Sequence, residues 1–130
     1  MARRLLKKEI KIDAFISSPA KRARKTAEAF VKEYKSDKNE IILFEELYMA
    51  GQSSFENVIK NTADSYNAIA VFSHNEGITH FANTLTDKKT DNIPTCGVFA
   101  VKIKTKHWKD FGDAKKEFWF FDYPKADEKD

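Results

Sequence analysis

Short apolar runs alternate with amphipathic segments along this chain. The runs at 14–17, 41–44 and 68–72 have the length of strands, and the last has five apolar residues without alternation. Such a run is typical of a strand that is covered on both faces in a parallel sheet. Later runs at 98–103 and 117–121 predict two strands that pair antiparallel at one side of the sheet.

Helical spacing marks the segments between these strands. The first residues read as the last turns of an amphipathic helix, and Ser18-Pro19 predicts the start of a helix that runs from about 19 to 35. Two shorter helices are expected around 55–59 and 78–85. The apolar positions that define the four helices are Ala2, Leu5 and Leu6; Ala23, Ala27, Phe30 and Tyr34; Phe55, Val58 and Ile59; and Ile78, Phe81, Ala82 and Leu85.

The alternation of strands and helices predicts an α/β fold, namely a three-layer α/β/α sandwich with a mostly parallel central sheet. Ligands of such folds bind beyond the carboxyl ends of the strands. With few Gly and Pro residues to mark a boundary, residues 1–124 are expected to form one domain, followed by a charged tail at 125–130 that frays.

Composition narrows the function classes. The 130 residues suffice for one core, and a net charge of +3 with mixed signs argues against a nucleic-acid partner. No apolar run approaches the roughly 18 residues that span a bilayer, so no membrane partner is expected. One cysteine excludes an internal disulfide framework, which suits a cytoplasmic protein.

Two strand ends carry chemically unusual residues. Arg22 lies in the first turns of the predicted second helix, where backbone N–H groups and the helix dipole favour an anion such as phosphate. His74 follows directly after the apolar strand 68–72 and Ser73. Taken singly, a solvated arginine and a hydrogen-bonded structural histidine are the better readings. His80 and His107 have no metal-ligand spacing, so neither a metal nor another cofactor is expected.

Two motifs resemble the histidine phosphatase superfamily, whose fold is phosphoglycerate mutase-like. Residues 17–27 resemble the segment SSPxxRAxxTA, and residues 71–77 resemble the second histidine motif. The segments 93–97 and 118–125 are similar to SixA-type phosphohistidine phosphatases in particular. The resemblance covers nearly the whole chain, and it implies a metal-independent hydrolase that removes phosphate from a phosphorylated protein histidine or a small phosphorylated substrate.

The resemblance also implies roles for individual residues. Arg22 would grip the transferred phosphoryl group and His74 would neutralise its charge in the transition state, with Asn75 and Glu46 as supporting residues. Glu46 lies near the position of a general acid in other branches of the superfamily, although a surface glutamate is the simpler reading. A phosphoramidate nitrogen leaves readily, which reduces the need for this acid.

The family nucleophile is a histidine in an Arg-His motif that ends the first strand, and this chain contains no such motif. We therefore expect the first central strand to be absent and its neighbours to have unpaired edges, which invite strand exchange. The chain alone is expected to be inactive, and to be poorly stable unless another segment fills the gap. The alternative is a non-catalytic binder of phosphate or phosphoprotein. The substrate and the oligomeric state stay open.

Overall fold

The computed structural model describes residues 1–36, 40–49 and 51–124, so the predicted tail at 125–130 lies outside the described residues. The α-helices are α1 (Ala2–Lys7), α2 (Lys21–Glu33), α3 (Gln52–Lys60) and α4 (Gly77–Leu85), and two short 3-10 helices are η2 (Glu45–Leu47) and η3 (Trp108–Asp110). The strands are β1 (Ala14–Ser17), β2 (Ile41–Leu43), β3 (Ile69–Phe72), β4 (Val98–Lys104) and β5 (Lys115–Asp122). Each of these α-helices and strands was expected from the sequence, with ends that differ by a few residues.

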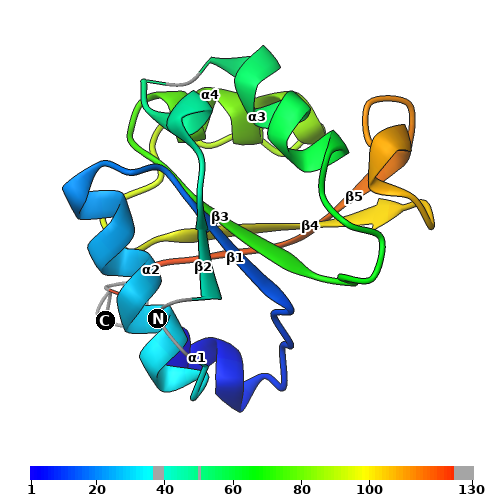
Figure 1. Cartoon of the computed structure of the whole chain (residues 1–130). Helices are drawn as coiled ribbons and strands as arrows, with labels where there is room; N and C mark the ends of the chain where they lie inside the picture. The colour runs from blue at the N-terminus through cyan, green and yellow to red at the C-terminus, as the bar shows by residue number, and fades with distance from the viewer. Residues whose placement is uncertain (37–39, 50, 125–130) are drawn as a thin grey trace.

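A parallel sheet with the order β2-β1-β3 forms the centre of the molecule (Figure 1). Ser17, at the end of β1, is in register with Leu43 of β2 and with Phe72 of β3. All four residues of β1 are buried because this strand is paired on both edges. The parallel arrangement predicted from the apolar runs is confirmed.

Helices cover both faces of this sheet, which gives the predicted three layers (Figure 1). Phe15 of β1 packs in one cluster with Leu5 of α1 and Phe30 of α2. The next residue, Ile16, packs on the opposite face with Phe55 of α3 and Phe81 of α4. Successive strand residues point to opposite faces, so β1 supplies both cores.

The two late strands pair antiparallel as expected, but they form a sheet of their own. Among the described residues, β4 is hydrogen-bonded to β5 and β3 to β1, and no described strand joins the two sheets. Apolar side chains connect them instead. Val98 and Phe120 pack on the cluster of α1 and α2, while Ile103 packs on the cluster of α3 and α4.

The second helix begins later than Ser18-Pro19 predicts. Its N-cap is Ala20, whose extended backbone (φ −56°, ψ 138°) keeps Pro19 and Ala20 outside the helix. The Ser18 hydroxyl accepts a hydrogen bond from the Ala20 N–H at 3.1 Å, so it stabilises a turn before the helix instead of capping the helix itself.

Candidate phosphate site at the carboxyl edge of the parallel sheet

The three parallel strands end at one edge of the sheet. The Ser18 N–H donates to the Phe72 carbonyl at 2.9 Å, and the Phe44 N–H donates to the Ser17 carbonyl at 3.0 Å. The loops that follow β1, β2 and β3 therefore begin next to one another. Arg22, Glu46 and His74 belong to these three loops and the helices that follow them.

Arg22 lies in the first turn of α2 and is exposed. Within the described ranges, its guanidinium has no hydrogen bond or ion pair to the protein, so its donors are available to a ligand. The N-cap Ala20 offers no side-chain cap, which leaves the first backbone N–H groups of α2 without a side-chain acceptor. The guanidinium and these N–H groups together make an electropositive end of the helix.

His74 is half-buried behind β3, and its neighbour Ser73 orients the ring. The Ser73 hydroxyl donates its single proton to the Leu47 carbonyl at 2.9 Å. In the contact of 3.3 Å between Ser73 Oγ and His74 Nδ1, the Nδ1–H group is then the donor and Ser73 Oγ the acceptor. Nε2 is the nitrogen left for a ligand, and it donates a hydrogen bond when the ring is protonated.

Asn75 uses its side chain inside the protein. Its Nδ2 donates to Asn92 Oδ1 at 3.0 Å and to the Ile93 carbonyl at 2.7 Å, and its Oδ1 accepts from the Thr79 hydroxyl at 2.6 Å. Thr79 is buried and also accepts from the Ile93 N–H at 3.0 Å. Asn75 thus fixes the loop at 92–93 against α4, and no local pattern in the sequence marks these long-range partners.

Glu46 is exposed on η2, and its Oε2 accepts a hydrogen bond from Asn57 Nδ2 at 2.7 Å. Because the next residue, Leu47, is bonded to Ser73, η2 lies at the same edge as β3. Glu46 is therefore near the candidate site, while its carboxylate is hydrogen-bonded to Asn57 of α3.

The other two histidines contact residues that do not belong to the candidate site. His80 is exposed on α4, with Nε2 3.8 Å from Glu76 Oε2. His107 contacts Asp64 Oδ2 through Nδ1 at 2.9 Å, before the amino end of β3. This hydrogen bond, together with one from the Trp108 N–H, lowers the pKa of Asp64 from its ordinary value.

Within residues 1–36, 40–49 and 51–124, no group of three His, Cys, Asp or Glu side chains is placed to hold a metal ion. No helix in the same ranges has the length and apolar character needed to cross a membrane.

No protein-family model matches the sequence, and no curated protein matches it. The solved structures that match the fold include two that are described here by name. One is a candidate phosphohistidine phosphatase SixA from Agrobacterium tumefaciens, with a TM-score of 0.70 and 18% identity over 95% of this chain and 77% of that one. The other is a candidate phosphohistidine phosphatase SixA from Nakamurella multipartitia, with a TM-score of 0.65 and 13% identity over 96% of this chain and 78% of that one. This chain accordingly shares the fold of these two structures.

Proposed function

We propose that the chain is a phosphohistidine phosphatase-type domain that binds the phosphoryl group of a phosphorylated protein histidine at the carboxyl edge of its parallel sheet. The observation that carries the proposal is the hydrogen bond between Ser18 and Phe72, because it joins the chain segments that lead to Arg22 and His74. The fold shared with SixA proteins supports the same substrate class.

The two side chains suit phosphoryl transfer. The transferred group carries charge on three equatorial oxygens, and catalysis consists mainly of fixed positive groups around them. The planar donors of Arg22 match two of these oxygens, and Nε2 of His74 donates to a third when the ring is protonated. Asn75 acts here as a positioning residue, because its bonds to Asn92 and Thr79 hold the loop that follows His74.

The proposed reaction passes through a covalent phosphohistidine intermediate, and its nucleophile is not among the three histidines of this sequence. His74 is assigned to charge neutralisation, while the rings of His80 and His107 contact Glu76 and Asp64. We therefore propose that the chain alone binds phosphate without turning over. Metal ions have no part in the proposal, and Glu46 is assigned no step.

The second candidate is a non-catalytic binder of phosphate or phosphoprotein, and the uncapped start of α2 beside Arg22 favours it equally. The two candidates share the site and differ in catalysis. They separate when a peptide with an Arg-His motif is added in trans: restored hydrolysis supports the hydrolase, and unchanged binding without hydrolysis supports the binder.

Binding of a phosphohistidine peptide, measured by isothermal titration calorimetry, tests the site. Arg22→Gln should weaken binding at least tenfold, because a charged bidentate donor is lost. Arg24→Gln, on the same helix and also exposed, is the matched control and should leave the affinity unchanged. Equal affinities of the two variants would contradict phosphate binding by Arg22. Robust hydrolysis by the chain alone would contradict the proposal that it lacks the nucleophile.

A further inference from the structure

A carboxylate and an imidazole form a hydrogen-bonded pair that the proposed function does not use. His107 Nδ1 lies 2.9 Å from Asp64 Oδ2. A carboxylate only accepts hydrogen bonds, so the ring proton is on Nδ1 and the lone pair of the neutral ring is on Nε2. Nε2 has no hydrogen bond to any described residue, and the His107 side chain is 54% exposed. The ring therefore presents an oriented nucleophilic nitrogen to the solvent.

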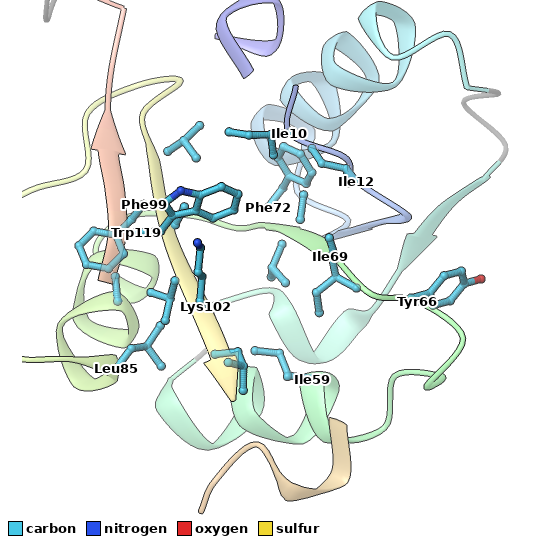
Figure 2. A pocket seen from close by; sticks show the side chains of 18 of the residues that line it. Ile10, Ile12, Ile59, Tyr66, Ile69, Phe72, Leu85, Phe99, Lys102 and Trp119 are labelled. Atoms are coloured by element: carbon cyan, nitrogen blue, oxygen red, sulfur yellow. The ribbon is translucent and has the colours of Figure 1, made fainter. Parts of the chain in front are cut away.

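Hydrogen bonds on both sides hold this pair in place. Asp64 Oδ1 accepts from the Trp108 N–H at 2.9 Å, and the His107 N–H donates to the Thr105 hydroxyl oxygen at 3.3 Å. Trp108 Nε1 donates to the Tyr66 carbonyl at 2.8 Å. Figure 2 shows Tyr66 on the segment that leads into β3, with its ring pointing away from the cavity that β3 and β4 line. Trp108 thus joins the two loops by two hydrogen bonds, so their connection does not depend on the His107 ring alone.

His107 differs in its partner from the other two histidines. His80 Nε2 lies 3.8 Å from Glu76 Oε2, which is beyond hydrogen-bond distance, and both side chains are largely exposed. Nδ1 of His74 contacts the hydroxyl of Ser73, which carries no charge. His107 is therefore the histidine whose ring is oriented by a charged acceptor, and such a partner makes the other ring nitrogen more basic.

The charges near the pair determine which group suits Nε2. Asp64 is held as a carboxylate by its bonds to His107 and to the Trp108 N–H, so it has no proton to give to a leaving group. The positive charge of Lys109 also acts on Asp64, and Asp110 is the next residue along the chain. A phosphoramidate fits these conditions, because its phosphoryl oxygens are anionic and its nitrogen carries its own protons when it leaves.

We propose that His107 is a phosphorylation site, with Nε2 as the acceptor of a phosphoryl group from a small phosphoramidate and Asp64 as a positioning residue. The Nε2 lone pair attacks phosphorus, and the P–N bond of the donor breaks with its electron pair going to the ammonia that leaves. Nδ1 keeps its proton, and Asp64 balances the positive charge of the phosphorylated ring. The site is independent of the carboxyl edge, because Asp64 precedes the amino end of β3 and His107 lies between β4 and β5.

Potassium phosphoramidate is the probe. Phosphorylation of each histidine is followed by phosphorus NMR and by tandem mass spectrometry at alkaline pH, where phosphohistidine is stable. His107 should be modified at least tenfold faster than His80, although His80 is the more exposed of the two at 76%. His107→Gln should remove the fast reaction, and His80→Gln should retain it.

The role of Asp64 is tested by Asp64→Asn. An amide donor opposite Nδ1 favours the ring form with its proton on Nε2, so phosphorylation of His107 should slow at least tenfold. Nitrogen chemical shifts of the ring should report this change of tautomer, which a loss of packing alone would not produce. Asp113→Asn is the matched control, because Asp113 is an exposed acid before β5 whose side chain has no hydrogen bond or ion pair to any described residue.

Three results overturn the proposal. The first is equal modification rates of His80 and His107, which would show only the general reactivity of an exposed imidazole. The second is attachment of the phosphoryl group to Nδ1 of His107. The third is an Asp64→Asn variant whose tautomer and rate both match those of the unchanged chain, since Asp64 then has no positioning role.

Discussion

Asp64 is a carboxylate whose acid–base behaviour depends on residues far away in the sequence. It accepts hydrogen bonds from His107 and from the backbone of Trp108, and both favour its charged form, so its pKa is lowered. For a carboxyl group with a lower pKa in the folded state, the stabilising contribution is present above the unfolded pKa. It is lost as the pH falls through the folded pKa.

His107→Ala should raise the pKa of Asp64 toward its ordinary value, because the hydrogen bond to His107 is the largest cause of the shift. The stabilising contribution of Asp64 above the unfolded pKa then becomes smaller, and the pH window over which it is lost becomes narrower. Carboxyl carbon chemical shifts from an NMR titration give the pKa, with His80→Ala as a control that leaves Asp64 alone. An unchanged pKa of Asp64 in His107→Ala rules out the assigned cause.

Single residues also show how far sequence reasoning reaches. Arg22 and His74 stand in short motifs that directly follow apolar strands, so the sequence alone predicts both as candidate site residues. Their role at a phosphate site stays a prediction. The partners of Asn75 were not predictable, because Asn92 and Ile93 are 17 and 18 residues away and no local pattern marks them.

At the scale of elements, hydrogen bonds from Arg4 hold the short helix α1 to the end of β5, and Lys8, the C-cap of this helix, adds an ion pair to Asp122 Oδ2 at 3.7 Å. The guanidinium of Arg4 donates to Asp122 Oδ1 at 3.0 Å, to the Tyr123 carbonyl at 2.9 Å and to the Pro124 carbonyl at 2.9 Å. A helix of six residues is too short to be stable alone. Its position therefore depends on these three hydrogen bonds of Arg4, which we call the Arg4 clasp, and on the buried side chains of Ala2 and Leu5.

Arg4→Gln should lower the free energy of unfolding by about 1–2 kcal/mol, as expected for partly buried hydrogen bonds from a charged donor. Hydrogen exchange of residues 2–7 should quicken as well. Arg3→Gln is the control: Arg3 pairs with Glu33 at 3.2 Å, but its side chain is 81% exposed, so its loss should be within the error of denaturant titration. Equal effects of the two substitutions would refute the clasp.

The positions of the elements were predictable because apolar runs and helical spacing record burial directly. The start of α2 was not predictable, because a serine hydroxyl before proline can accept a hydrogen bond from a backbone N–H either as a helix cap or within a turn. Here Ser18 bonds to Ala20 N–H, and the helix begins at Lys21. The separation of β4 and β5 from the parallel sheet depends on strand order, which local patterns do not contain.

At the scale of the whole molecule, the described parts of the two sheets are joined by apolar contacts and not by strand pairing. The strand β4 is packed at both ends, by Val98 on the side of α1 and α2 and by Ile103 on the side of α3 and α4. Both core clusters thus contain residues of both sheets. The hairpin of β4 and β5 should not melt separately from the helices.

Urea unfolding followed by two signals tests this coupling. The two tryptophans lie in η3 and β5 and report the hairpin side, whereas far-UV circular dichroism mainly reports the four α-helices. We expect the two transitions to coincide. A fluorescence midpoint clearly below the circular dichroism midpoint would mean that the hairpin detaches first.

The contact between Arg4 and Pro124 makes the described chain almost a closed ring. Its two extremities meet on the surface, so joining them with a short flexible linker demands little rearrangement of the backbone. The exposed loop at 87–89 is then a suitable place for new chain ends. A circularly permuted chain with its new ends there would end shortly after α4 and would still contain each of the described helices and strands.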